Sequence, residues 1–137
     1  MKTTPANITE LKPNQVFVFG SNLAGIHGAG AALLAKRKFG AMRDIGIGLR
    51  GQSYAIPTKS RLIETLPLHR IAEYVDGFIE FAEEHPDKEF LVTKIGCGLA
   101  GYEVAEIAPL FVAHEIPSNV SLPAEFWAVQ KPQQNSK

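Results

Sequence analysis

The sequence predicts an α/β fold: a three-layer α/β/α sandwich with a mixed, mainly parallel central sheet. Short apolar runs that are typical of buried strands alternate along the chain with longer segments of helical periodicity. Two glycine-rich segments each follow an apolar run directly. Loops at the carboxyl ends of strands have this placement in α/β folds, and ligands bind there. We therefore expect helices on both faces of the sheet and any ligand site at the carboxyl ends of its strands.

Three apolar runs predict the main strands. Residues 16–20 (VFVFG) form an unbroken run of aromatic and β-branched residues, which is typical of a strand buried on both faces. Residues 53–58 and 89–96 predict the second and third strands. Two later segments, 119–123 and 125–130, are strand candidates that would complete the sheet.

Three segments between these runs predict helices. Residues 31–40 are rich in helix formers and end at a glycine. Residues 68–85 carry apolar side chains at helical spacing, and Pro86 stops this helix. A third helix is expected over residues 104–115, provided that Pro109 lies near its first turn, where a missing N–H is tolerated.

Composition narrows the class of protein. The 137 residues are expected to form one domain over 1–130, followed by a polar, flexible tail over 131–137. The 14 acidic and 14 basic side chains cancel, so net charge gives no argument for nucleic acid or an anionic membrane. No segment resembles a signal peptide or a membrane helix, and we expect a cytoplasmic protein. One cysteine excludes an intrachain disulfide, and four scattered histidines predict no metal site.

The first glycine-rich segment, GSNLAGIHGAGAA at 20–32, lies between a predicted strand and a predicted helix. Backbone N–H groups that open into a helix N-terminus bind anions, and glycine lets a ligand approach the main chain closely. Gly28, Ala29 and Gly30 are therefore candidates for a phosphate cradle. The spacing matches neither the P-loop nor the dinucleotide fingerprint, and a glycine-rich turn without a ligand is the alternative.

The second glycine-rich segment, KIGCGLAGYE at 94–103, repeats this design. Two such loops on neighbouring strand ends can hold a ligand from two sides, and a pyrophosphate with a sugar at each end suits them. Tyr102 either stacks on a sugar or base or covers the core. Cys97 lies near a predicted helix N-terminus, which suits a nucleophile, but a small buried cysteine is the commoner case.

Together, the two segments resemble those of the macrodomain family, which binds ADP-ribose. Asn22 is followed by four residues and then by HGAGAA, which is the spacing of the family's Asn and His-Gly-Gly-Gly-Val-Ala motif. GLAGY at 98–102 fits the family's second loop. IGCGLAGY at 95–102 and YAIPTK at 54–59 are most similar to the branch of terminal ADP-ribose protein glycohydrolases. The resemblance covers most of the chain, from residue 7 to residue 123.

This resemblance implies a role for each matching residue. Asn22 would bond the distal ribose, and Lys59 would attack its anomeric carbon as a nucleophile. His27 would act as a general base, contact the ligand or cap the loop. Asn7 stands where many macrodomains have an aspartate that accepts the adenine amino group, and an asparagine can still accept that bond. The glycohydrolase branch has an aspartate where this sequence has Ala100, so the acid of its lysine–aspartate mechanism is missing.

The predicted site follows from these roles. The predicted catalytic residues are Lys59, Asn22 and His27. The glycine-rich loops would hold the diphosphate between them. The predicted ligand-binding residues are Asn7, Ser21, Asn22, Gly28, Ala29, Gly30, Ala31, Gly96, Cys97, Gly98, Leu99, Ala100, Gly101 and Tyr102.

The predicted function is hydrolysis of an ADP-ribose adduct at the distal ribose, without a cofactor. The adduct would be an ADP-ribosyl ester, O-acetyl-ADP-ribose or ADP-ribose 1″-phosphate, and its carrier a protein or a nucleic acid. A binding module that recognises ADP-ribose without turnover is the first alternative, and Ala100 favours it. Another nucleotide-binding α/β domain is the second.

Overall fold

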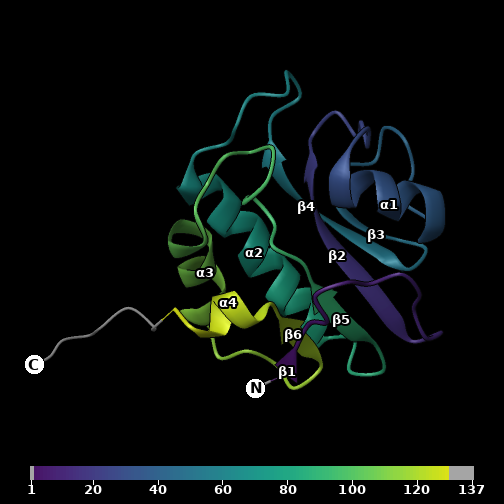
Figure 1. Ribbon diagram of the computed structural model, residues 1–137, viewed down its shortest axis with the longest axis vertical. Coiled ribbons are helices and arrows are strands. Elements are labelled where there is room, and N and C mark those ends of the chain that lie inside the picture. Colours follow the sequence, from purple (N-terminus) through teal and green to yellow (C-terminus); the bar gives the residue numbers. More distant parts are fainter. Residues whose placement is uncertain (1, 130–137) are drawn as a thin grey trace, which may run out of the picture.

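The computed structural model describes residues 2–129, which form a six-stranded sheet with helices on both faces (Figure 1). The strands are β1 (Lys2–Thr3), β2 (Gln15–Asn22), β3 (Gly48–Arg50), β4 (Ser53–Lys59), β5 (Glu89–Val92) and β6 (Val120–Leu122). The helices are α1 (Gly30–Lys38), α2 (Leu68–Glu83), α3 (Val104–Val112) and α4 (Ala124–Trp127). The strand order is β1-β6-β5-β2-β4-β3, and only the β3–β4 pair is antiparallel among the described strands. This confirms the predicted mixed, mainly parallel sheet. The predicted tail, 131–137, lies outside the described residues.

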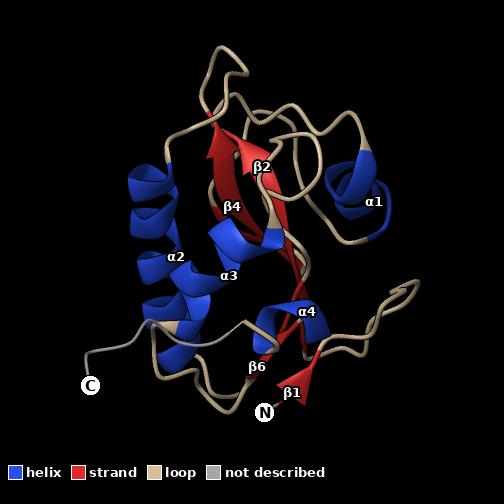
Figure 2. Ribbon diagram, turned by 60° about the vertical axis from the view of Figure 1, so that its left-hand side comes forward, coloured by secondary structure: helices blue, strands red, loops and turns tan. Residues whose placement is uncertain are grey.

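The sheet separates two cores because successive side chains of β2 point to opposite faces. Val16 and Val18 face the larger core, which contains the buried side chains of α2 and α3. Phe17 and Phe19 face the smaller core, where they pack with Ala35 of α1. Figure 2 shows α1 on one side of the sheet and α2 and α3 on the other. The three-layer prediction is therefore confirmed.

The connections of the chain diverge at β2, which lies between β4 and β5. From β2 the chain passes through α1 and β3 to β4 on one side, and from β4 it passes through α2 to β5 on the other side. Such a switch point leaves a crevice at the carboxyl ends of the central strands, where the loops part. Both glycine-rich segments begin at this edge of the sheet, the first in the last residues of β2 and the second just after β5.

Two predicted strands differ from the structure. The strand expected over 89–96 ends at Val92, because the Ile95 N–H turns back to the Thr93 carbonyl at 2.8 Å and leaves the ladder. The strand expected over 125–130 is wrong, since residues 124–127 form helix α4. The ring of Phe126 in this helix is fully buried, 5.5 Å from the ring of Phe111 in α3. Tertiary packing decides the conformation of this segment.

Helix α3 does not place Pro109 in its first turn, contrary to the expectation. Pro109 lies in the second turn and cannot donate to the carbonyl of Ala105. The helix ends soon afterwards at Val112, so few further bonds depend on that position. Glu103 and Glu106 form a capping box that holds the first turn. The short edge strands β1 and β3 were not predicted.

Candidate functional site

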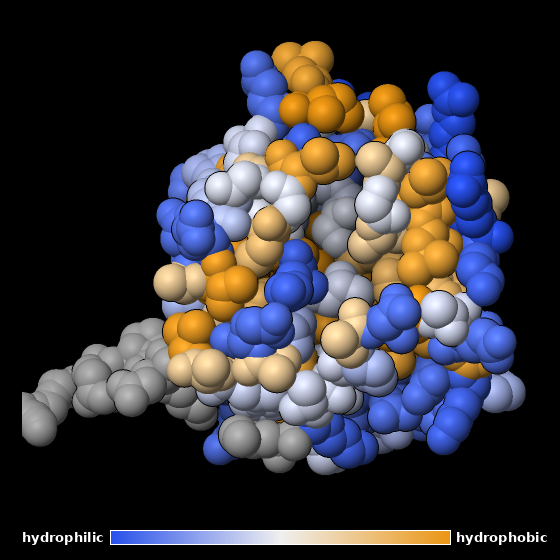
Figure 3. Space-filling view, viewed as in Figure 1, coloured by the Kyte–Doolittle hydropathy of each residue, from blue (hydrophilic) through white to orange (hydrophobic). Residues whose placement is uncertain are grey.

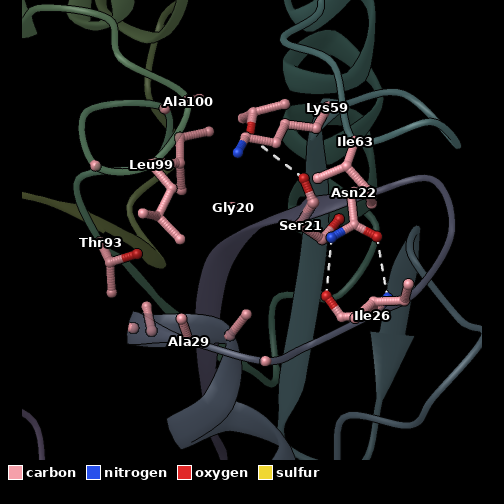
Figure 4. Close-up of a pocket in the computed structure, with 18 of the residues that line it drawn as sticks. Gly20, Ser21, Asn22, Ile26, Ala29, Lys59, Ile63, Thr93, Leu99 and Ala100 are labelled. Atoms are coloured by element: carbon pink, nitrogen blue, oxygen red, sulfur yellow. Dashed lines mark hydrogen bonds between the residues drawn. The ribbon is translucent and has the colours of Figure 1, made fainter.

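A cavity of about 500 Å³ lies at the switch point, between the two glycine-rich loops. We call it the Lys59 cavity. The carboxyl ends of β2 and β4 form one wall, and the segment after β5 forms another (Figure 4). The surface in Figure 3 is hollowed near its centre, with hydrophobic side chains on both sides. The lining residues are Gly20, Ser21, Asn22, Ile26, Gly28, Ala29, Gly30, Ala31, Ala32, Thr58, Lys59, Ile63, Thr93, Lys94, Ile95, Gly96, Gly98, Leu99 and Ala100.

The N-terminus of α1 opens into this cavity. The first bond of the helix that the structure shows runs from the Leu33 N–H to the Ala29 carbonyl, and the preceding N–H groups have no partner within the helix. Ala29 gives no side-chain cap, and the first turn holds no acidic residue. The helix dipole adds positive potential at this end. The predicted cradle therefore has the geometry of an anion site.

The glycines of the two loops leave space in front of the main chain. A Cβ atom added at Gly28 or at Gly98 would meet nothing within 4 Å. Gly30 has a φ of +59°, which other residues rarely adopt, so its glycine is required by the backbone. Gly28 and Gly98, unlike Gly30, are therefore positions at which a side chain can be added without backbone strain.

A second cavity, of about 630 Å³, adjoins the first. We call it the Asn7 cavity. The two cavities share Gly30, Ala31, Thr93 and Lys94, so they form one groove that passes over the start of α1. The Asn7 cavity is lined on one side by apolar side chains and on the other by the start of α4. Its remaining lining residues are Thr3, Thr4, Pro5, Ala6, Asn7, Ile8, Phe17, Leu34, Val92, Pro123, Ala124 and Glu125.

Lys59 ends β4, and its side chain extends across the first cavity toward the segment that carries Leu99 and Ala100 (Figure 4). It forms no ion pair with any residue between 2 and 129. No aspartate or glutamate lines this cavity within the described part of the chain. Lys59 is therefore free to meet a ligand, but no carboxylate accompanies it.

Apolar side chains surround the Lys59 end of the groove. Ile26, Ile63 and Leu99 line the cavity, although they are 51%, 41% and 76% exposed. Ile63 has a φ of +62°, an unusual and strained conformation for a β-branched residue. The Thr65 hydroxyl donates to the Ala100 carbonyl at 3.0 Å and ties this segment to the second glycine-rich loop.

The amide of Asn22 closes the first loop on itself. Its Nδ2 donates to the Ile26 carbonyl at 2.8 Å, and its Oδ1 accepts the Ile26 N–H at 3.0 Å (Figure 4). One N–H of Nδ2 is left for a ligand. Ser21 lines the cavity too, but its buried hydroxyl donates to the Gly46 carbonyl and so holds two loops together. The ligand contacts predicted for both residues stay predictions.

His27 lies behind the loop and does not line the groove. The side chain is 3% exposed, and its Nε2 lies 3.0 Å from the Met42 carbonyl and 3.1 Å from that of Ile45. The ring meets Phe19 edge-on at 5.4 Å. Of the three roles that the sequence left open, this placement favours the structural one, in which the imidazole caps the loop.

Three residues predicted to bind a ligand do not line the groove. Cys97, Gly101 and Tyr102 face a neighbouring surface depression, which shares only Lys94 and Gly98 with the Lys59 cavity. The Tyr102 hydroxyl donates to the Leu66 carbonyl at 2.6 Å, which fixes the loop and leaves the ring packed against the core. Burial raises the pKa of the Cys97 thiol, and although Lys94 opposes this effect, the acids Glu103 and Glu106 add to it. A raised pKa does not suit a nucleophile.

Sequence reasoning missed Thr93 and Lys94, where β5 leads into the second glycine-rich segment. Thr93 and Lys94 line both cavities. Lys94 directly precedes IGCGL in the sequence, and this position could have drawn attention to it. Glu125 was missed because its segment was predicted to be a strand. Nothing in the sequence marks Ile63 as a lining residue.

Comparisons with known proteins support the fold. No protein-family model and no curated protein matches the sequence. Among solved structures, the chain is similar to Thermosipho africanus DarTG in complex with ADP-ribose, with a TM-score of 0.57 and 19% identity. The likeness shows the fold. It covers 82% of this chain and only 38% of that one, and it agrees with a macrodomain-like α/β architecture.

Across residues 2–129, no group of three or more histidine, cysteine, aspartate or glutamate side chains is placed to hold a metal ion. None of the described helices has the length and apolar character that crossing a membrane requires.

We predict that His27→Ala lowers the free energy of unfolding by about 2–4 kcal/mol, because it removes a buried ring and its hydrogen bonds. Urea denaturation measures this loss. The exposed His69 provides the control, and His69→Ala leaves stability nearly unchanged. A His27→Ala variant that keeps full stability but loses ligand binding would instead place the imidazole on the ligand.

Proposed function

We propose that the protein binds ADP-ribose in the groove formed by the two cavities. The observation that carries this proposal is the position of the α1 N-terminus at the junction of the cavities. A diphosphate would lie at the junction, with one group on either side of it. The structurally similar DarTG chain is in complex with ADP-ribose, which agrees with this ligand.

The diphosphate would be bound chiefly by the backbone. The free N–H groups at the start of α1 and the helix dipole favour an anion there. Gly28 and Gly98, which both line the Lys59 cavity, leave room there for phosphate oxygens. No carboxylate lines the described part of the Lys59 cavity to repel them.

The two ends of the groove suit the two ends of ADP-ribose. The Asn7 cavity offers the partly exposed apolar side chains of Ile8 and Leu34 to a base, and Asn7 supplies an amide that can bond its edge. The distal ribose would then lie in the other cavity, near Lys59 and Asn22. The reverse orientation would put the base beside the cationic side chain of Lys59 and away from these apolar surfaces.

We expect isothermal titration calorimetry to detect ADP-ribose binding, and we expect Gly28→Val to weaken it at least tenfold, which corresponds to about 1.4 kcal/mol. The added side chain would occupy the space that the diphosphate needs. Gly77 on α2 is the matched control, because a Cβ there also meets nothing within 4 Å but the site is remote from the groove. Equal losses in Gly28→Val and Gly77→Val, or none in either, would contradict the proposed position of the ligand.

Hydrolysis at the distal ribose is the second candidate function, and the direction of the Lys59 side chain favours it. A neutral lysine amine could attack the anomeric carbon and displace the carrier group, and water would then release ADP-ribose and restore the amine. Ala100 lines the same cavity where the glycohydrolase branch has its aspartate, so proton transfer would have to use water. For this reason binding alone is the function that the geometry supports best.

The hydrolase hypothesis predicts that Lys59→Arg abolishes release of ADP-ribose from ADP-ribosylated protein and from ADP-ribose 1″-phosphate, whose leaving groups are on the anomeric carbon, as followed by mass spectrometry. Arginine keeps the positive charge but stays protonated, so ADP-ribose affinity should change less than about threefold. Ala100→Asp restores an acid to the cavity and should raise the rate. No release by the unaltered protein, at concentrations where it binds ADP-ribose, would restrict the function to binding.

A further inference from the structure

Lys94 holds a distinctive position in the groove. It follows β5 directly and is one of the four residues shared by the two cavities, beside Gly30 and Ala31 at the start of α1. Its Nζ donates to Glu125 Oε2 at 3.1 Å, and both side chains are 53% exposed. The pair thus joins the segment after β5 to the first turn of α4, at the edge of the Asn7 cavity.

The groove has few other charges. Among the described residues that line the two cavities, the cations are Lys59 and Lys94, and the only carboxylate is that of Glu125. Lys59 lines one cavity alone, away from the junction. Lys94 is therefore the cation best placed to meet an anion bound at the α1 N-terminus, and Glu125 is the charge that competes with it.

The ion pair between Lys94 and Glu125 is weak enough for its two partners to separate. An exposed lysine–carboxylate pair is weak, because water competes for both groups and salt screens them. A diphosphate carries two negative charges and would meet Lys94 beside the helix N-terminus, which favours the same anion. Two interactions keep the pKa of Glu125 below its usual range. The larger is a hydrogen bond from its own backbone N–H, and the smaller is the hydrogen bond and positive charge of Lys94. The carboxylate is therefore ionised at neutral pH.

We propose that Lys94 binds the diphosphate of the ligand and that Glu125 restrains Lys94 in the empty groove, so that ligand binding exchanges one anionic partner of the lysine for another. This inference rests on the proposed ADP-ribose site and assigns it a cation, Lys94, that was not among the predicted ligand-binding residues. It also makes Glu125 a residue that lowers affinity, through its hold on Lys94 and its repulsion of phosphate. The pair thereby adjusts the affinity of a site that is formed chiefly by the backbone.

The test compares three variants by isothermal titration calorimetry with ADP-ribose and, separately, with inorganic pyrophosphate. Lys94→Ala should weaken both ligands about tenfold, the effect of losing one charge-assisted bond. Glu125→Gln should strengthen both by about three- to tenfold, since it removes the competing charge. Glu73→Gln is the control, because Glu73 forms a comparable exposed pair with Arg70 at 3.4 Å on α2, outside the groove. It should leave both affinities unchanged.

The outcomes separate this inference from the proposed function. If the unaltered protein binds ADP-ribose and Lys94→Ala binds it equally well, or if Glu125→Gln binds it more weakly, the role of the pair is wrong while the ADP-ribose site stands. If pyrophosphate binds in a manner that depends on Lys94 but ADP-ribose does not bind, the nucleotide assignment is wrong and the anion site stands. Binding of neither ligand overturns both. Thermal unfolding of each variant verifies that these exposed substitutions leave the fold intact.

Discussion

The parallel pairing of β2 with both β4 and β5 is the constraint on which the rest of the molecule depends. It brings the carboxyl ends of three strands to one edge, and the chain leaves them in different directions through α1, α2 and the second glycine-rich loop. The crevice follows from this topology. The alternation of Val and Phe along β2 supports it by filling a core on each face of the sheet.

The chemistry of the groove is divided between backbone and side chains. The proposed anion site is formed by the main chain at the start of α1, and its form depends on glycine rather than on charged groups. The side chains of Asn22, Ser21 and His27 are engaged mainly with neighbouring carbonyls, and they fix the loops that carry this backbone. Among the described lining residues, charged side chains occur only at Lys59 and at the Lys94–Glu125 pair. Binding thus has more support in the structure than catalysis does.

The sequence predicted the layers and the position of the groove because apolar periodicity and glycine placement are local properties. It could not predict which side chains face the groove. His27 lies within the glycine-rich motif, yet its ring turns inward to Met42 and Ile45, residues well ahead in the chain. The Tyr102 hydroxyl likewise donates a hydrogen bond to the distant Leu66 carbonyl. Helix α4 forms because Phe126 packs on Phe111. These outcomes depend on long-range contacts, which no local pattern encodes.

The most direct test of the ADP-ribose site is a titration of isotopically labelled protein with ADP-ribose, followed through its backbone amide resonances. We predict the largest shifts at Gly28, Gly30 and Ala31, with smaller ones along the segment from Thr93 to Gly98 and none around the His114–Asp76 pair on the far side of α2 and α3. Shifts that leave the start of α1 unchanged, or no shifts at millimolar ligand, would contradict the account.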